Sequence, residues 1–343
     1  MSMTTPSSAP LTTDVAIIGA GPVGLFAVFE CGMLKMKCHV IDALDSIGGQ
    51  CAALYPEKPI YDIPGYPVIP AAELVEQLDQ QAQPFGPTFH LGQRVEALQR
   101  QGDGFLLTTS AGTRISAKAV FIAAGAGAFG PNRPPLQDIE EYEGKSVFYY
   151  VKKRDDFRAK RVVIAGGGDS AVDWALALEG IADTISVVHR RDKFRAAPES
   201  SAKLAALAKE GRIDLVVPYQ LHALEGDSGQ ISAVIVCDLD GKSRTLPADA
   251  LLPFFGLSMD LGPIAHWGLA IEKHHLTVDP SRCETSEPGI FAIGDVAAYA
   301  GKLKLILTGF AEAAMASHAA HARVFPGQAL HFEYSTSKGV PVA

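Results

Sequence analysis

Hydrophobic and polar residues follow the same order in two separate parts of this chain, residues 15–42 and residues 162–191. Each part has an apolar run, a glycine turn, a stretch with apolar residues at helical spacing, and a second apolar run. Unbroken apolar runs that flank a helical pattern are typical of buried parallel strands joined by a helix. The pattern therefore predicts two βαβ units and an α/β fold.

Further elements are expected between and after these units. Residues 42–70 form a long stretch rich in glycine, proline and tyrosine, and loops of this length in a compact domain are usually functional. We expect helices over 71–86, 196–211 and 307–325, with short strands in the remaining segments.

Both glycine turns have the spacing of a dinucleotide-binding fingerprint. The first glycine lets the chain leave a strand sharply, the second lets backbone N–H groups approach a pyrophosphate, and a third small residue lets the helix pack on the sheet. The helix N-terminus adds unpaired N–H groups and partial positive charge. The expected contacts are Gly19, Gly21, Pro22 and Gly24 in the first copy, and Gly166, Gly168, Asp169 and Ser170 in the second.

The two copies differ where the second strand of each unit ends. The spacing from Gly19 to Asp42 equals that from Gly166 to His189, but the second copy continues with Arg190 and Arg191. A carboxylate at this place accepts hydrogen bonds from ribose hydroxyls and repels a 2′-phosphate, whereas arginines attract one. We therefore expect two chemically different dinucleotides, with NADPH in the second copy.

Composition narrows the class of protein. A length of 343 residues fits two domains. The net charge of −8 argues against nucleic acid as the main partner, and no apolar stretch is long enough to cross a bilayer. Residues 1–13 resemble a disordered tail rather than a secretory signal. The five cysteines form no zinc spacing and are expected to be reduced in a cytoplasmic protein, and we expect no metal site.

Asp295 follows a short apolar strand at a glycine turn before the last predicted helix. An acidic residue in such a turn is often simply part of the turn. The functional alternative is a carboxylate that binds a ribityl hydroxyl of a flavin, with the N-terminus of the next helix directed at the flavin ring.

Several motifs together resemble those of flavoprotein oxidoreductases with two dinucleotide-binding domains. These are GAGPVG, GGQ, VFIAAGAG, GGGDSA, HRR and GIFAIGDVA, and the resemblance covers nearly all of residues 14–337. It is greatest to the thioredoxin-reductase-like branch. The redox dithiol of that branch is missing here, because residues 150–153 are Tyr-Val-Lys-Lys. The Cys-x4-Cys pair of glutathione-reductase-like relatives is missing too, because Cys51 is followed by proline at position 56. Electrons are therefore expected to leave the flavin directly.

Two remaining segments resemble the ferredoxin–NADP⁺ reductases of this branch: LYPEKPIYDIPGYP and the tail EYSTSKG. The resemblance implies that Tyr55 stacks on one face of the flavin, that Tyr334 covers the other, and that Ser335 lies near flavin N5. Gly49, Gln50 and Thr336 are expected to bind FAD. The tail is similar to those that reach across a homodimer, so a homodimer is expected.

The order of elements predicts two Rossmann-like domains, with the NADPH-binding domain inserted into a split FAD-binding domain. The expected division is 1–13 disordered tail, 14–125 first part of the FAD domain, 126–255 NADPH domain, 256–326 second part of the FAD domain, and 327–343 tail over the flavin.

The expected activity is hydride exchange between NADPH and FAD and single-electron exchange with ferredoxin or flavodoxin. Residues 145–161 carry seven Lys or Arg against two acids and, with Lys302 and Lys304, suit an acidic carrier, although the same segment fits an ordinary solvated face. Two other functions remain open: an NADPH oxidase or quinone-type reductase, and a non-catalytic sensor of NADPH.

Overall fold

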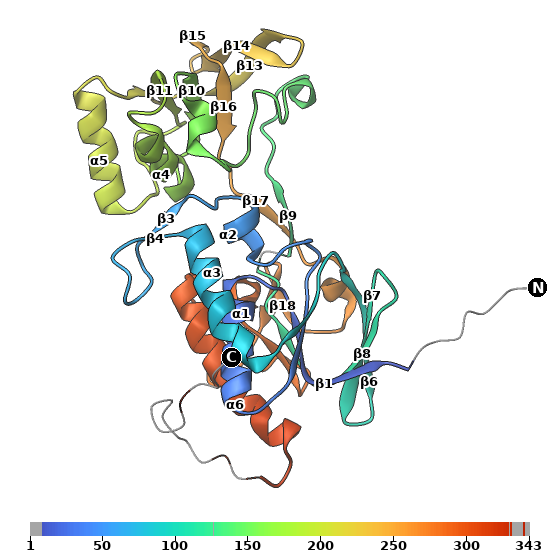
Figure 1. Ribbon diagram of the computed structural model, residues 1–343. Helices are drawn as coiled ribbons and strands as arrows, with labels where there is room; N and C mark the ends of the chain where they lie inside the picture. The colour runs from blue at the N-terminus through green and yellow to red at the C-terminus, as the bar shows by residue number, and fades with distance from the viewer. Residues whose placement is uncertain (1–8, 126, 329, 331–338, 340–343) are drawn as a thin grey trace, which may run out of the picture. The chain divides into compact units, whose positions relative to one another are not determined.

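The computed structural model of the protein describes residues 9–125, 127–328, 330 and 339 (Figure 1). The chain separates into two compact units. Unit 1 comprises Met1–Ala128 and Met259–Ala343, and unit 2 comprises Phe129–Ser258. Unit 2 is thus inserted into unit 1 along the chain, and the divisions after Ala128 and Ser258 lie close to the predicted boundaries at 125 and 255.

Unit 1 is built on a mixed sheet with strand order β5-β2-β1-β8-β7-β6, and β20 also pairs with β8. The strands β5, β2, β1, β8 and β20 are mutually parallel where they pair, whereas β6, β7 and β8 form an antiparallel meander. The bounds are β1 Leu11–Ile18, β2 Cys38–Ile41, β5 Thr88–His90, β6 Val95–Gln101, β7 Gly104–Thr109, β8 Arg114–Ile122 and β20 Ile290–Ala292.

Helices α1 (Pro22–Met33) and α6 (Ile306–Val324) cover one face of this sheet, and α3 (Ala71–Ala82) packs on α1. Helix α1 packs against both α3 and α6 (Figure 1). Because side chains alternate along a strand, Ile17 joins a core with α1 and α6, whereas its neighbour Ile18 joins a second core on the other face. The buried strand ends thus lie between two hydrophobic layers.

Two predictions for the N-terminal half need correction. The first concerns Leu11–Thr13, which belong to β1 rather than to a disordered tail, because Leu11 pairs with Ile115 of β8. The second concerns residues 42–70, expected to be irregular, which contain the short helix α2 (Gly49–Ala53) and the hairpin β3 (Pro59–Ile60) and β4 (Ile69–Pro70). Residues 1–8 lie outside the described part of the chain.

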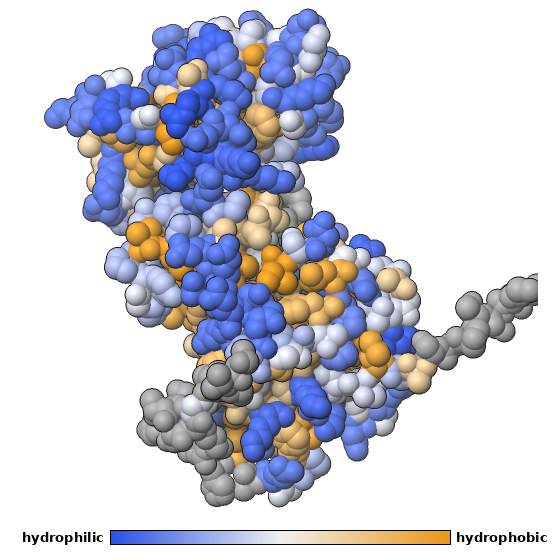
Figure 2. Space-filling model, viewed as in Figure 1, coloured by the Kyte–Doolittle hydropathy of each residue, from blue (hydrophilic) through white to orange (hydrophobic). Residues whose placement is uncertain are grey.

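Unit 2 combines a parallel sheet of order β12-β11-β10-β16 with an antiparallel sheet β13-β14-β15. Helices α4 (Asp169–Leu178) and α5 (Pro198–Lys209) follow β10 and β11. The face of unit 2 visible in Figure 2 is mostly hydrophilic. The bounds are β10 Arg161–Ala165, β11 Thr184–Val188, β12 Asp214–Val216, β13 Gln220–Asp227, β14 Gln230–Cys237, β15 Ser243–Pro247 and β16 Ala250–Pro253.

Short elements complete the chain. The two crossings between the units are the strands β9 (Ala128–Pro131) and β17 (Leu257–Asp260), which pair with each other. Within the described residues, no helix has the length and apolarity that a membrane span requires. The remaining short elements are the strands β18 Ile271–Glu272, β19 His275–Thr277 and β21 Ala297–Ala298 and the 3₁₀ turns η1 Gln83–Phe85, η2 Ile139–Glu141, η3 Arg154–Phe157, η4 Gly262–His266 and η5 Gly294–Val296.

Candidate functional site

The two fingerprints have the same backbone geometry. In unit 1 the Gly19 N–H donates to the Ile41 carbonyl at 2.8 Å, and in unit 2 the Gly166 N–H donates to the Val188 carbonyl at 3.0 Å. Each glycine thus leaves its strand beside the last residue of the neighbouring parallel strand. The glycine turn and the end of the second strand therefore lie together in both units.

Packing fixes the first position of both fingerprints and the third position of the first fingerprint. A Cβ atom at Gly19 would lie 2.3 Å from the Ala123 carbonyl oxygen, and one at Gly24 would lie 1.9 Å from the Gly19 carbonyl oxygen. In unit 2 a Cβ at Gly166 would lie 2.6 Å from the Phe254 carbonyl oxygen. These distances are too short for any side chain, so the fold itself requires glycine there.

The second position is different, because space is open beside it. A Cβ at Gly168 would meet no atom within 4 Å, and one at Gly21 would meet only the Gly49 Cα, at 4.0 Å. Packing within the protein therefore does not require glycine at either place. Both glycines precede the first residue of a helix, Pro22 of α1 and Asp169 of α4. A glycine that leaves room at a helix N-terminus fits a phosphate that approaches the backbone closely.

Asp42 lies immediately after β2 and holds the first glycine turn. Its carboxylate accepts hydrogen bonds from the Ala20 N–H at 2.6 Å and from the Leu44 N–H at 2.8 Å. Burial raises the pKa of Asp42, and the bonds from the backbone oppose that rise. Since each carboxylate oxygen can accept more than one hydrogen bond, Asp42 retains acceptor capacity for ribose hydroxyls.

Helix α2 brings further predicted residues to the same turn. The N–H of Gly48, which precedes α2, donates to the Ala20 carbonyl at 2.8 Å, and a Cβ at Gly49 would lie 3.1 Å from the Gly21 Cα. Gln50 extends toward Gly125, which lies in the turn after β8; a Cβ at Gly125 would lie 3.6 Å from the Gln50 Nε2. Gly49 and Gln50 are thus beside the first fingerprint.

Tyr55 and Asp295 come from distant parts of the sequence and share one environment. Burial raises the pKa of Tyr55, and the Cys51 thiol and the Asp295 carboxylate contribute to that rise. Asp295 lies in η5, directly after β20 and before the strand β21. The Tyr55 side chain packs against a buried cluster that includes residues of α3, with the Lys58 ammonium 5.7 Å from its ring centroid.

All five cysteines are free, and four of them are buried. Cys38 lies next to Cys31, and the Cys31 thiol together with burial raises the pKa of the Cys38 thiol. Burial raises the pKa of Cys51, which lies beside Tyr55, to about 11. A thiol with such a pKa is protonated at neutral pH and is a poor nucleophile.

In unit 2, His189 lies under the second glycine turn. The residue is buried, and a Cβ at Gly167 would lie 2.2 Å from the His189 Cε1. Burial and the positive charges of the neighbouring arginines lower the pKa of His189. The imidazole therefore stays neutral and packs as a flat support for the turn, and its buried Nε2 atom has no protein hydrogen-bond partner.

Three arginines surround the His189 imidazole. Arg190 and Arg191 are exposed, as expected of residues that meet a phosphate. Sequence reasoning missed a third, Arg195, whose backbone N–H donates to the Gly167 carbonyl at 2.6 Å. Asp169 fixes the same connection, since its carboxylate accepts a hydrogen bond from the Ala197 N–H at 2.9 Å, whereas Ser170 is exposed on α4. No sequence pattern marks Arg195, because it reaches the glycine turn through a backbone bond of an irregular segment.

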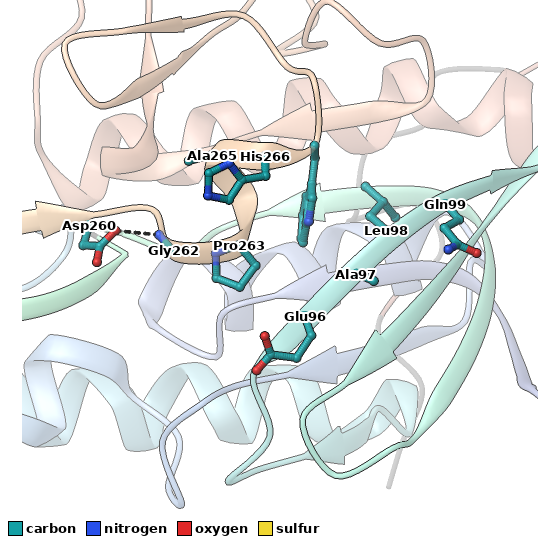
Figure 3. A pocket seen from close by; sticks show the side chains of 10 residues that line it. Glu96, Ala97, Leu98, Gln99, Asp260, Gly262, Pro263, Ala265 and His266 are labelled. Carbon is teal, nitrogen blue, oxygen red and sulfur yellow. Dashed lines mark hydrogen bonds between the residues drawn. The ribbon is translucent and has the colours of Figure 1, made fainter.

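Other predictions stand apart from these two sites. Tyr334, Ser335 and Thr336 lie outside the described residues. A groove of about 690 Å³ in unit 1, between β6 and η4, contains none of the predicted residues; Glu96, Leu98, Pro263 and His266 line it (Figure 3). Among the residues that the structure describes, no group of three or more potential metal ligands occurs.

Comparison with known proteins identifies the family of the chain and agrees with this fold. The model of the pyridine nucleotide-disulphide oxidoreductase family matches residues 13–321, and the chain belongs to that family. Within it, the similar curated proteins are ferredoxin–NADP reductases. The chain is 62% identical to that of Paramagnetospirillum magneticum, over 96% of this chain and 98% of the relative, and 66% identical to that of Granulibacter bethesdensis, over 96% and 95%.

Solved structures give the same fold. The thioredoxin reductase of Lactococcus lactis is similar with a TM-score of 0.80 and 26% identity, over 91% of this chain and 99% of that chain. The thioredoxin reductase of T. acidophilum has a TM-score of 0.80 at 22% identity, over 91% of this chain and 98% of that chain. The predicted fold class is therefore confirmed.

Proposed function

We propose that this protein is an FAD-dependent ferredoxin–NADP⁺ oxidoreductase. The observation that carries the proposal is the pair of glycine turns with open space beside Gly21 and Gly168. Asp42 lies beside the first turn, and a cluster of arginines lies beside the second. The relatives named ferredoxin–NADP reductase support it at 61–66% identity. FAD belongs to unit 1 and NADPH to unit 2.

In unit 1, the protein binds and orients FAD. The N-terminus of α1 and the Gly21 turn face the pyrophosphate, Asp42 accepts hydrogen bonds from the ribose, and Asp295 accepts one from the ribityl chain. Tyr55 packs on the flavin ring. Held by these residues, FAD would supply the redox chemistry: acceptance of a hydride from NADPH and transfer of single electrons to two ferredoxin or flavodoxin molecules, with release of one proton.

In unit 2, the arginines select the nucleotide. Arg190, Arg191 and Arg195 surround the end of β11, where a 2′-phosphate lies when the pyrophosphate meets the Gly168 turn. Each charge-assisted bond from an arginine to a phosphate contributes about 1.5–3 kcal/mol. The neutral His189 adds no charge of its own and holds the turn in place.

The tail, the oligomeric state and the location extend this proposal. We propose that Tyr334 and Ser335 lie over the flavin of a partner in a homodimer, and that Thr336 adds a cofactor contact; the resemblance of EYSTSKG to ferredoxin–NADP⁺ reductase tails supports this. The free cysteines support a cytoplasmic location. Removal of residues 328–343 is expected to change the rate of NADP⁺ release, and an unchanged rate would contradict the role of Tyr334.

The experiment that tests the function compares electron acceptors. The purified protein is expected to carry an FAD spectrum and to reduce ferredoxin with NADPH much faster than it reduces thioredoxin or oxygen. Rapid oxygen consumption without ferredoxin would favour an NADPH oxidase instead. Failure to reduce ferredoxin or any one-electron dye would favour a sensor without catalysis.

A further inference from the structure

A buried charged cluster connects α6 with the turn that carries Asp295. Its centre is Glu312, which is 0% exposed and is the single acidic residue of α6. Glu312 accepts hydrogen bonds from the Gly294 N–H at 2.7 Å and from the Tyr299 hydroxyl at 2.6 Å. It also forms an ion pair with Lys302, whose side chain is only 7% exposed.

Helix α6 approaches the same turn at a second point. A Cβ at Gly309 would lie 2.3 Å from the Val23 Cγ2 and 3.3 Å from the Gly294 Cα. Glycine at 309 thus lets α6 lie directly on α1 and on the backbone of the turn. Together, Gly309 and Glu312 fix the first two turns of α6 against the residue that precedes Asp295.

Stability alone is a weak reason for such a cluster. Taking a carboxylate and an ammonium out of water is costly, and well-packed apolar residues in place of a buried ion pair are often as stable. The charged cluster instead fixes the orientation of the backbone beside Asp295. The short bond from the Gly294 N–H to Glu312 orients the peptide next to Asp295, and burial together with the Glu312 bond raises the pKa of Tyr299 so that its hydroxyl remains a donor.

We propose that Glu312 is a positioning residue for FAD. It holds the Asp295 turn and the N-terminus of α6 in one fixed arrangement, so that both meet the flavin together. Lys302 balances the Glu312 charge, so the anchor adds no net negative charge near a cofactor that gains electrons. The inference rests on the proposed binding of FAD by unit 1.

The test uses the full-length holoenzyme and two measurements, the dissociation constant of FAD and the midpoint potential of the bound flavin. Glu312→Leu removes both the acceptor and the charge and is expected to weaken FAD binding about tenfold or more. Glu312→Gln keeps an oxygen acceptor and is expected to restore part of that affinity. Glu312→Gln leaves the Lys302 charge unbalanced and raises the potential, whereas Lys302→Met lowers it.

A matched pair of milder variants covers the case in which Glu312→Leu fails to fold. Tyr299→Phe removes one hydroxyl bond to Glu312, and Tyr149→Phe removes a bond of the same 2.6 Å length to Glu143 in unit 2. Only Tyr299→Phe is expected to weaken FAD binding. If it does not, or if the potentials of Glu312→Gln and Lys302→Met equal that of the wild type, the proposal is overturned. A wild-type protein that binds no FAD would contradict the proposed function itself.

Discussion

At the scale of single residues, the nucleotide specificity proposed for unit 2 depends on three exposed arginines around one neutral imidazole. His189 is neutral because burial and Arg190, Arg191 and Arg195 all disfavour its charged form. The imidazole thus supports the glycine turn through contact with Gly167 rather than through charge. The arginines remain at the surface, where they can reach a 2′-phosphate.

Replacement of Arg190 and Arg191 by alanine is therefore expected to raise the KM for NADPH and to leave that for NADH unchanged. Loss of about 1.5–3 kcal/mol per arginine–phosphate bond corresponds to roughly 10- to 100-fold per residue. Steady-state kinetics with both nucleotides measures the effect. Arg195→Ala is expected to act in the same direction.

Arg212→Ala is the matched control, because Arg212 is an exposed arginine of the same unit that pairs with Glu179 instead. It should leave both KM values unchanged. An equal rise in KM for NADPH and NADH in the Arg190 and Arg191 variants would exclude recognition of the 2′-phosphate.

At the scale of elements, the two βαβ units use their glycines for two separate purposes. Gly19, Gly24 and Gly166 allow strands and helices to approach, since a Cβ there would overlap a backbone carbonyl. Gly168 lies at the start of α4 with open space around it. A substitution at the first kind of position affects folding, whereas one at Gly168 should affect only the ligand.

Gly168→Ala is expected to leave the thermal stability of the nucleotide-free protein within about 1 kcal/mol of the wild type, because its backbone has φ −99° and its surroundings are open. The same methyl group would occupy space beside the pyrophosphate, so the dissociation constant for NADPH should rise about tenfold or more. Calorimetry of NADPH binding and a thermal melt separate the two effects. A large loss of stability with unchanged NADPH affinity would show that the open space serves folding.

The pairing of β2 with β5 brings two imidazoles together in unit 1. His39 Nδ1 and His90 Nε2 are 3.0 Å apart, and burial lowers the pKa of both. Because the folded pKa values lie below the ordinary value of 6.5, the unfolded chain binds more protons. Their contribution to stability is therefore present above pH 6.5 and is lost as the pH falls through the folded pKa values.

His90→Asn is expected to reduce this acid-side loss, so that the melting temperature falls less between about pH 7.5 and pH 5 than in the wild type. His222→Asn, which changes an exposed histidine of unit 2, should keep the wild-type slope. Identical slopes in the His90 variant and the wild type would mean that this pair does not determine the pH dependence.

The sequence predicted the parts of the fold that follow from regular patterns of apolar residues and glycines. Apolar runs and glycine spacing predicted the βαβ units and the fold class, because burial on both faces of a parallel sheet leaves few alternatives. Patterns could not predict contacts made by irregular segments. Arg195 reaches the glycine turn through a backbone bond, and Glu312 is recognisable in the sequence only as a lone acid in an apolar helix. The α2 helix was missed because five residues are too few for a periodic signal.

At the scale of the whole molecule, the net charge disfavours association with the proposed acidic partner, whereas a local basic surface favours it. The chain has a net charge of −8, which repels acidic ferredoxins or flavodoxins at long range. Residues 145–161 are rich in Lys and Arg, but Arg158 and Arg161 form ion pairs with Asp155 and Asp249. Lys152, Lys153 and Arg154 are exposed beside them and are the residues that we expect to guide the carrier.

Charge reversal of these three residues to glutamate is expected to slow ferredoxin reduction about 10- to 100-fold at low ionic strength and to flatten its dependence on salt. NADPH oxidation with a small neutral or anionic dye should change far less, since it needs no docking. Stopped-flow measurements over a range of salt concentrations give both quantities.

The control applies the same total change of charge elsewhere in unit 2, with Lys203, Lys209 and Arg212 replaced by glutamate; all three are exposed. If steering depended only on net charge, both triple variants would slow equally, because the long-range field follows the sum of charges. A local docking surface instead makes the Lys152, Lys153 and Arg154 variant much slower than its control. Equal rates in the two variants and the wild type would place the docking surface on another part of the molecule.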